Sequence, residues 1–533
     1  MTEPPSSSNY DLAIAGSGFA GSILASIARR LGLSVVILEK GSHPRVVIGE
    51  SSTPLTALLL EELAAKYDLP TLAAFSKWGS WRREHPEIAC GLKRGFTFHH
   101  HTPAQPASSG RDSQLLVAAS PNESIGDVHW YRADFDHFLL NEAVRHGAVY
   151  YDLVHSLTPS FDSEGVTLTA TRHDDPVHIR AKFLVDATGP RGFLHRALSL
   201  GESTLPGMPA TEALYNHFTC AATLESGNHA RLNGQPPPYP IDQAAVHHLF
   251  PGGWVWVLQF HHSMNGGGIT SAGVACTQET AARLNLREGQ PAWQRLLEEI
   301  PALKEQFAHA KPERAFTHIP QLSFRSAAIV DPNKQPRWAL LPSAAGFVDP
   351  LLSTGFPLTL LGVSRLAQLF SQHEPATWSS PAFAQDLRTY AEATDTELLA
   401  AAHLIAALYA NLDDFPVFAA LSLLYFAAVS YAETARRLGR ADLAPNFLLH
   451  DAPNFGPAMK DLCARAQQPR TLQESAALIK SIYRVIEPID VAGLCDTTRR
   501  NWYPVEAADL YANAYKLGVT QEEISALLKR CGF

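Results

Sequence analysis

The stretch from Asp11 to Lys40 carries the pattern that most restricts the fold of this chain. DLAIAG is an apolar run of strand type, SGFAGSILASIARRLG has apolar residues at helical spacing, and SVVILEK is a second, β-branched run. A strand, a helix and a second strand in this order form a βαβ unit, whose two strands lie parallel in one sheet. The N-terminal part of the chain is therefore predicted to be an α/β domain.

The turn inside this unit reads GSGFAG, a GxGxxG pattern directly between the strand and the helix. Glycines at these positions allow a tight turn and a close backbone approach to a pyrophosphate, which the helix N-terminus can bind. Glu39 ends the second strand, where its carboxylate can accept hydrogen bonds from ribose hydroxyls. The predicted contacts with a bound dinucleotide are Gly16, Gly18, Phe19, Ala20, Gly21, Glu39 and Lys40.

Composition narrows the functional class. A chain of 533 residues is expected to hold two or three domains. Its formal net charge of −9 argues against a nucleic-acid partner, because phosphate contacts need a clustered basic surface. The six cysteines are scattered without a CxxC pair, which favours a reduced, cytoplasmic protein. His99 and His101 share a strand face but have no third ligand at a convincing spacing, so no metal site is predicted.

Neither a signal peptide nor a membrane span is expected. The polar start MTEPPSSSNYD has no basic region followed by an apolar run. The uncharged stretch PVFAALSLLYFAAVSY, residues 416–431, is shorter than a bilayer span and is predicted to be a buried helix.

The remaining chain divides into two regions. Residues 102–125 are rich in Pro, Ser and Gly and are predicted to be mainly loop, and strand-like runs follow. From about residue 374 the apolar residues take helical spacing and continue so to the end. We expect an α/β nucleotide-binding domain over 1–373, with an inserted antiparallel substrate sheet at about 200–330. An all-helical region is expected over 374–533.

Two further stretches indicate that the dinucleotide is FAD. FLVDATGP at 183–190 is a strand followed by a turn, and YRADFDHFLLNEAVRHGA at 131–148 places Arg132 at the start of an amphipathic helix. Together with GSGFAG, these stretches resemble the FAD-dependent monooxygenase superfamily over roughly residues 10–370. The resemblance implies flavin contacts by Arg132, Asp186, Ala187 and Gly189.

Three stretches resemble one branch of that superfamily, the flavin-dependent halogenases similar to tryptophan halogenase. HPRVVIGESSTP at 43–54 resembles the segment that straps the flavin, GGWVWVLQF at 252–260 resembles a WxWxIP motif, and FVDPLLSTGF at 347–356 resembles the flavin-and-halide segment. Backbone amides near Thr354 and Gly355 would hold the halide, since tight turns expose several N–H groups together. The residues that this resemblance adds to the site are Arg45, Glu50, Ser51, Trp254, Trp256, Asp349, Pro350, Ser353, Thr354, Gly355 and Phe356.

The same family uses a catalytic lysine at the far end of a tunnel, and two lysines compete for that role. Lys93 begins the strand-like run KRGFTF, whereas Lys77 lies earlier among bulky aromatic residues in FSKWGSW. The local pattern favours Lys93, with Lys77 as the alternative.

The chain also departs from the family pattern. Leu258 and Gln259 replace the Ile-Pro of WxWxIP, and Leu352 stands where tryptophan halogenases have a glutamate before Ser-Thr-Gly. Pro342-Ser343 replaces a Gly-Asp pair that often contacts the ribityl chain in the superfamily. A typical halogenase of free tryptophan is therefore not expected.

The resemblance implies an oxidoreductase that uses FAD, as FADH2, with O2 and chloride or bromide. It would act on an electron-rich indole, pyrrole or phenol, free or carrier-linked, through a flavin C4a-hydroperoxide and hypohalous acid. No second GxGxxG marks an NAD(P)H domain, so a separate flavin reductase is expected as partner; homodimer formation stays open. The alternatives are a halide-independent flavin monooxygenase or dehydrogenase, and a non-catalytic FAD-binding protein.

Overall fold

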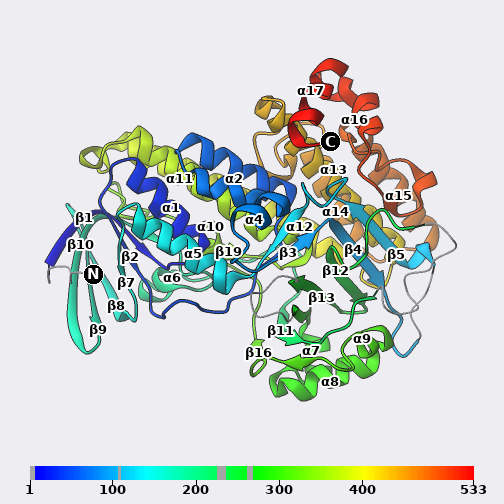
Figure 1. Cartoon of the computed structure of the whole chain (residues 1–533), viewed down its shortest axis with the longest axis horizontal. Helices are drawn as coiled ribbons and strands as arrows, with labels where there is room; N and C mark the ends of the chain where they lie inside the picture. Colours follow the sequence, from blue (N-terminus) through cyan, green and yellow to red (C-terminus); the bar gives the residue numbers. More distant parts are fainter. Residues whose placement is uncertain (1–6, 106–109, 225–235, 261–267) are drawn as a thin grey trace.

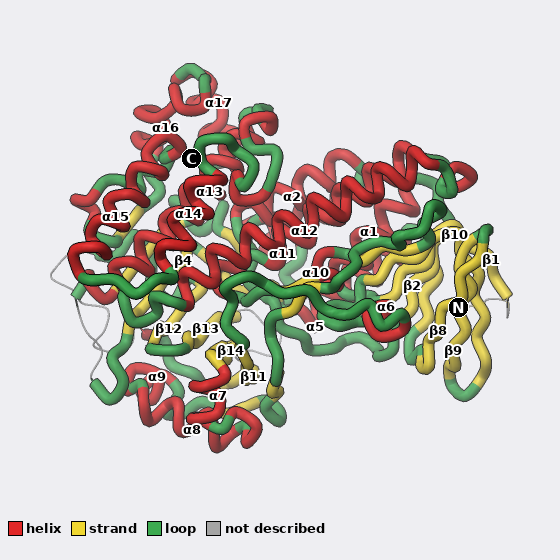
Figure 2. The backbone as a smooth tube through the Cα atoms, turned by 180° about the vertical axis from the view of Figure 1, so that it is seen from behind, coloured by secondary structure: helices red, strands yellow, loops and turns green. Residues whose placement is uncertain are grey.

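The computed structural model describes residues 7–105, 110–224, 236–260 and 268–533. Two large sheets lie at different ends of an elongated molecule, the first beside the N-terminus and the second below the C-terminal helices (Figure 1). The long helices α11 (Gly355–Gln372) and α12 (Pro381–Tyr409) extend between the two ends (Figure 2).

The first sheet has the strand order β7-β2-β1-β10-β9-β8, and β18 pairs with β10. Strands β7, β2, β1, β10 and β18 are parallel, whereas β9 and β8 are antiparallel. The strands are β1 (Ser7–Ala15), β2 (Val35–Leu38), β7 (Val149–Tyr151), β8 (His155–Asp162), β9 (Gly165–Arg172), β10 (Asp175–Asp186) and β18 (Trp338–Leu340).

Helix α1 (Phe19–Arg30) connects β1 to β2, which confirms the predicted βαβ unit. The β1 residues Leu12, Ala13 and Ile14 are fully buried, as expected for parallel strands covered on both faces. Helices α5 (Arg132–Arg145) and α11 both pack against α1.

The second sheet has the order β15-β11-β14-β13-β12-β4-β5-β20, and β16 pairs with β11. Its strands are β4 (Gly95–His100), β5 (Gln114–Ala118), β11 (Thr211–Thr219), β12 (Ala245–Phe250), β13 (Gly253–Phe260), β14 (Ile269–Thr277), β15 (Lys311–Pro312), β16 (Thr317–Ile319) and β20 (Trp502–Tyr503). Beside it, β3 (Cys90–Lys93) and β6 (Asp127–Trp130) form a separate antiparallel pair.

This second sheet is larger than the predicted insertion at about 200–330. Strands β4 and β5 come from earlier in the chain, and β5 lies inside the stretch 102–125 that was predicted to be mainly loop. The sheet is also not wholly antiparallel, because β12 pairs parallel with β4 and β5 pairs parallel with β20. Long-range pairing explains the difference, since β5 has one neighbour close in sequence and the other about four hundred residues later.

Strand β13 carries the sequence GWVWVLQF and is buried along its whole length. Trp254, Trp256 and Leu258 face the main core, whereas Val255 and Val257 pack in a separate cluster with helices below the sheet. Those helices are α7 (Gln278–Leu284), α8 (Gln290–Glu299) and α9 (Pro301–Gln306). The alternation of strand side chains thus places both tryptophans on one face.

The C-terminal region is helical apart from the short strand β20. Its remaining helices are α13 (Phe415–Arg437), α14 (Gly456–Ala466), α15 (Leu472–Ile486), α16 (Ala507–Asn513) and α17 (Gln521–Cys531). Helix α13 extends the predicted apolar helix, and by length and composition it could cross a membrane. However, 83% of its most apolar window is buried inside the protein, which is typical of a core helix.

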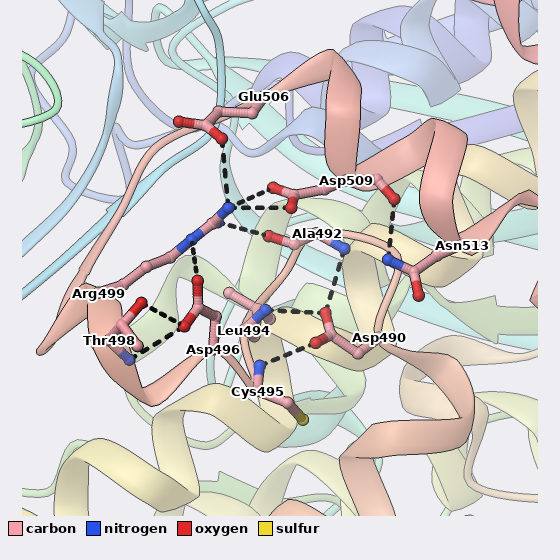
Figure 3. A network of polar contacts seen from close by, with 10 residues as sticks. All are labelled: Asp490, Ala492, Leu494, Cys495, Asp496, Thr498, Arg499, Glu506, Asp509 and Asn513. Carbon is pink, nitrogen blue, oxygen red and sulfur yellow. Dashed lines mark hydrogen bonds and ion pairs between the residues drawn. The ribbon is translucent and has the colours of Figure 1, made fainter.

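A polar network holds the segment that carries β20 (Figure 3). Arg499 donates two hydrogen bonds to Asp509, at 2.9 and 2.8 Å, and Asp490 accepts from the backbone N–H of Leu494 and Cys495 at 2.9 and 2.8 Å. These bonds fix the turn between α15 and α16, so that β20 reaches β5.

The shorter helices and strands connect these layers. They are α2 (Pro54–Lys66), α3 (Pro70–Ala73), α4 (Trp78–Glu84), α6 (Phe193–Ala197), α10 (Pro342–Ala345), β17 (Phe324–Arg325) and β19 (Gly346–Phe347). Helix α2 packs against both α11 and α13 and so joins the nucleotide-binding half to the helical half.

The contact between β13 and β14 predicts a sensitive position. A Cβ atom on Gly273 would lie 2.4 Å from the Trp256 ring and 2.6 Å from Cβ of Tyr215. We expect Gly273→Ala to lower the free energy of unfolding by about 1–3 kcal/mol, measured by urea denaturation, because the ring cannot move without repacking.

Gly268→Ala is the matched control, since its new Cβ would lie 3.9 Å from the nearest atom, the Phe260 carbonyl oxygen. Equal loss of stability in both variants would contradict this account of the packing.

Candidate functional site

A cavity of about 720 Å³ lies between the two sheets. It is lined by the α1 N-terminus, the segment 45–51, the turn 187–191, the tryptophan face of β13 and the segment 346–356. A volume in this range is typical of a site for a small molecule or cofactor. The predicted site residues on its wall are Gly18, Phe19, Ala20, Arg45, Glu50, Ser51, Arg132, Ala187, Gly189, Trp254, Trp256, Asp349, Pro350, Ser353, Thr354, Gly355 and Phe356.

The glycine turn has the backbone geometry that the GxGxxG pattern requires. Gly16 has φ +100°, and a Cβ on Gly21 would lie 2.2 Å from the Gly16 carbonyl oxygen, so neither position has room for a side chain. No side chain caps the α1 N-terminus at Gly18. The N–H groups of the first helical turn therefore face the cavity and can receive a phosphate.

Glu39 is held at the end of β2 beside this turn. Its Oε2 accepts from the N–H and the hydroxyl of Ser17, at 3.1 and 3.0 Å, and lies 3.5 Å from Nη2 of Arg45. Burial raises the pKa of the Glu39 carboxyl, but Arg45 and the Ser17 hydrogen bonds outweigh burial and hold it below its ordinary value. Glu39 is therefore a fixed carboxylate that can still accept hydroxyl donors.

The segment 49–52 is anchored from three sides, by Arg132, His217 and Lys93. Arg132 forms a bidentate ion pair with Asp136, both contacts at 2.7 Å, and donates to the Gly49 carbonyl at 2.9 Å. Glu50 Oε1 lies 2.7 Å from Nε2 of His217, and both side chains are buried. Arg132 therefore fixes the position of this segment and stabilises the first turn of its own helix, α5.

Several predicted contacts lie away from the cavity. Asp186 is fully buried, and its carboxylate accepts from the N–H and hydroxyl of Thr188 and from the N–H of Leu194. It shapes the turn after β10 rather than lining the cavity. Lys40 is exposed, and Gly16, Gly21 and Glu39 are not on the cavity wall.

The segment 350–356 makes a sharp turn into α11. Leu352 and Ser353 both adopt left-handed backbone angles, with φ values of +64° and +55°. Leu352 is buried and carries no charge, so this position supplies no carboxylate. No side chain caps the α11 N-terminus at Thr354, and Thr354 and Gly355 line the cavity. A left-handed turn followed by an uncapped helix start favours an anion.

Hydrogen bonds through Tyr409 of α12 connect Trp254 on the cavity wall with Asp349, just before this segment. Trp254 Nε1 donates to the Tyr409 hydroxyl at 3.2 Å, and that hydroxyl donates to Oδ2 of Asp349 at 2.7 Å. Burial raises the pKa of the Asp349 carboxyl to about 7, although hydrogen bonds from Leu351, Tyr409 and Trp254 oppose the shift. Tyr409 therefore joins α12, β13 and the predicted halide segment.

Lys93 is fully buried and its ammonium group has a defined position. Its Nζ donates to the Ser51 hydroxyl at 2.8 Å and to the Ser52 carbonyl at 2.6 Å, and it lies 3.7 Å from the centre of the Phe96 ring. Burial lowers the pKa of Lys93 to about 7, although Asp127 opposes the shift. The residue ends β3 and does not begin the next strand, because β4 starts at Gly95.

A second cavity, of about 180 Å³, lies on the other side of Lys93. Its wall includes Phe96, Asp127, Tyr425 and Tyr503, and α13 and α17 close it. Lys77 also lines it, but this lysine is partly exposed and lies 3.6 Å from Glu61. Lys93 contacts Ser51 of the first cavity and Phe96 of the second, so it lies in the partition between them.

Aromatic rings fill the rest of the partition. The His247 ring centre lies 5.3 Å from that of Trp254 and 5.9 Å from that of Phe96. Burial and the nearby Lys93 lower the pKa of His247 to about 3, so its ring is neutral. The tryptophans thus line the first cavity, and His247 and Phe96 continue their wall to Lys93.

Sequence patterns did not identify several partners of the site. Asp136 could have been found, because it stands four residues after Arg132 on a predicted helix. His217, Tyr409 and Asp127 come from distant elements, and no local pattern distinguishes them. Among the described residues no group of three or more His, Cys, Asp or Glu side chains could hold a metal ion.

Comparison with known proteins gives similarities in sequence and in fold. The model of the tryptophan halogenase family matches residues 99–409, more than half of the chain. The halogenase PrnC for monodechloroaminopyrrolnitrin, from Pseudomonas fluorescens, is 28% identical over 68% of this chain and 61% of its own. Tetracycline 7-halogenase from Kitasatospora aureofaciens is also 28% identical, over 66% of this chain and 61% of its own. The match thus spans less than two thirds of either relative.

A chlorinase of pyrrole-2-carbonyl carrier protein from Pseudomonas fluorescens is 26% identical over 66% of this chain and 73% of its own. The crystal structure of halogenase PltM with phloroglucinol and FAD superposes with a TM-score of 0.78 over 92% of this chain and 99% of that one. Because the sequence identity is 24%, the similarity to the PltM structure establishes the fold alone.

The contact of Tyr409 with Trp254 and Asp349 predicts a stability effect. Tyr409→Phe would leave the buried Trp254 N–H and an Asp349 oxygen without this partner. We expect the free energy of unfolding to fall by about 1–3 kcal/mol in urea denaturation. Tyr511→Phe is the control, because that hydroxyl bonds to Ser525 at the exposed surface; its effect should stay within about 0.5 kcal/mol. Equal effects would contradict the assignment.

The raised pKa of Asp349 predicts a pH dependence. Its folded pKa of about 7 exceeds the ordinary value of 3.8, so its contribution to stability is present below about pH 4 and is lost as the pH rises through about 7. Between these pH values the free energy of unfolding should fall more steeply for the wild type than for Asp349→Asn, which cannot titrate. Parallel curves from urea denaturation across this range would show that the carboxyl is ionised throughout.

Proposed function

The chain belongs to the tryptophan halogenase family, and we propose that it halogenates an electron-rich aromatic compound with reduced FAD, O2 and chloride or bromide. The observation that carries this proposal is the position of Lys93 in the partition between a large cavity with a glycine-turn phosphate site and a smaller one. A plain flavin monooxygenase has no need of a buried amine at that place.

The residues of the larger cavity fit FAD. The α1 N-terminus would take the pyrophosphate, Glu39 the ribose hydroxyls, and the segment 45–51 would cover the cofactor, with Arg132 holding that segment. When bound in its reduced form, FAD with O2 supplies the oxidising equivalent that converts a halide ion into hypohalous acid. Contacts with the flavin by Asp349, Pro350, Gly355 and Phe356 are part of the same proposal.

The protein groups then have distinct tasks. The turn at Ser353 and Thr354 and the start of α11 bind the halide through backbone N–H groups. Trp254 and Trp256 exclude water and separate the two cavities. Lys93, whose amine loses its charge readily, holds the hypohalous acid beside the smaller cavity.

The smaller cavity is the proposed site of the aromatic acceptor. Phe96, Tyr425 and Tyr503 give it aromatic walls, and Asp127 and Lys77 add polar groups. Walls of this kind suit a single planar ring such as a phenol, pyrrole or indole. We also propose that residues 1–373 bind the cofactor and that residues 374–533 close the acceptor site.

Partners and location follow from the same chemistry. We propose a separate NAD(P)H-dependent flavin reductase as the source of reduced FAD, and a cytoplasmic location, where the six cysteines stay reduced. The acceptor is a small aromatic compound or the same ring on a carrier protein.

The test is a halogenation assay with FAD, a flavin reductase, NADH and bromide or chloride. Phloroglucinol, indole and pyrrole-2-carboxylate serve as acceptors, and monochlorodimedone reports free hypohalous acid. We expect a halide-dependent product by mass spectrometry, and a loss of at least about 100-fold in Lys93→Met. Lys77→Met should lose only a few-fold, because that lysine is paired with Glu61 at the cavity edge.

Lys182→Met serves as the control, since Lys182 pairs with Asp11 on the first sheet, away from both cavities. An oxygenated product formed without halide would replace the proposal by a monooxygenase. FAD binding without halide oxidation or any product would leave a non-catalytic flavoprotein.

A further inference from the structure

Asp127 is a buried carboxyl group that interacts electrostatically with Lys93. It begins β6, and the register of the β3·β6 pair sets it directly opposite Lys93. Side chains of directly opposed residues in an antiparallel pair lie on the same face, with Cβ atoms about 4.5–5.5 Å apart. Both side chains are almost fully buried.

Asp127 also belongs to the wall of the smaller cavity, together with Phe96 and Tyr425. Within the described part of the chain, its Oδ2 atom is buried and has no hydrogen-bond partner. A buried carboxyl oxygen without a partner is costly, and at a cavity wall a group that enters the cavity can supply the partner.

The surroundings of Asp127 favour its protonated form. Burial raises the pKa of this carboxyl to about 8, whereas Lys93 and Arg437 act in the opposite direction. Glu433 of α13 and Glu61 of α2 act in the same direction as burial. The carboxyl therefore keeps its proton near neutral pH, as a proton donor must.

Other polar groups of this region are less suited to proton transfer. His247 stays neutral and its Nδ1 is bound to the Thr97 carbonyl at 3.2 Å. Glu433 already accepts a hydrogen bond from Arg437 at 2.6 Å. Among the described residues on this wall, Asp127 combines a buried position, an unpaired oxygen and direct opposition to Lys93.

We propose that Asp127 is a catalytic residue that gives a proton to hypohalous acid held at Lys93 and takes the proton that the aromatic ring releases. The inference rests on the proposed function, because the proposed reaction supplies the hypohalous acid.

The step balances as follows. The ring carbon attacks the halogen and forms the carbon–halogen bond, while the oxygen–halogen bond breaks with its electron pair on oxygen. The Asp127 carboxyl protonates that oxygen, and water leaves. The same carboxylate then accepts the proton from the substituted carbon, whose C–H electrons restore the aromatic ring. Asp127 ends in its starting form, and the net reaction converts an aromatic C–H bond and hypohalous acid into a carbon–halogen bond and water.

Asp127→Asn tests this role in the full-length protein loaded with FAD. In the variant, the halogenation of phloroglucinol should fall by about 100-fold or more relative to the hypohalous acid that monochlorodimedone traps. Asp331→Asn is the matched control, because Asp331 is a buried carboxylate that lines neither cavity. FAD binding by fluorescence verifies the fold of each variant, and Asp127→Glu, which restores the carboxyl, should recover part of the rate.

Equal halogenation by the wild type and Asp127→Asn would overturn the role of Asp127 while leaving the proposed function intact. Halide oxidation lost together with halogenation would also overturn it, since Asp127 would then act earlier. If the wild type oxidises no halide at all, the proposed function fails instead.

A second measurement needs no turnover. Infrared spectra of the wild type minus Asp127→Asn, recorded across a pH titration, should show a carboxylic acid band that persists at neutral pH and disappears well above the ordinary pKa of an aspartate, 3.8. The charged groups that also act on Asp127 or line its cavity are Lys93, Lys77, Glu61, Glu433, Arg437 and Glu506. Absence of the acid band at neutral pH would overturn the proposal, because an ionised carboxylate has no proton to give.

Discussion

The segment Gly49–Ser52 is the part of the molecule on which both cavities depend. Arg132 of the nucleotide-binding half holds its Gly49 carbonyl, His217 of the second sheet holds Glu50, and Lys93 holds Ser51 and Ser52. Four hydrogen bonds from three distant elements thus meet on four consecutive residues. A shift of this segment would alter the cofactor cavity and the position of the amine together.

The burial of Lys93 lowers the stability of the fold. An ammonium group out of water is unfavourable by several kcal/mol unless polar groups surround it or it loses its proton. Here two oxygen acceptors and the face of Phe96 stabilise the charged form, and burial favours the neutral form. The balance leaves an amine that changes charge near neutral pH, a property that a surface lysine lacks.

Local patterns in the sequence were sufficient for the βαβ unit, the glycine turn and the segment 347–356, because each of these depends on residues that are neighbours in the chain. The tryptophan wall was also predictable, since strand alternation sets Trp254 and Trp256 on one face. Tyr409, Asp127 and His217 were not, because their roles arise from packing between elements hundreds of residues apart. Strand β5 was missed for the same reason: its Pro- and Ser-rich surroundings resemble a loop until β4 and β20 pair with it.

The pairing of β20 with β5 has a consequence for how the protein is made. Trp502 and Tyr503 of β20 pair with Leu116 and Val117 of β5 at the edge of the second sheet. Tyr503 also lines the smaller cavity. The loop that this contact closes includes most of the chain, so it forms late and at a large entropic cost. During synthesis on the ribosome, the nucleotide-binding half can fold while the acceptor side is still open. Under the proposed function, hypohalous acid would be confined only in chains whose synthesis has passed β20.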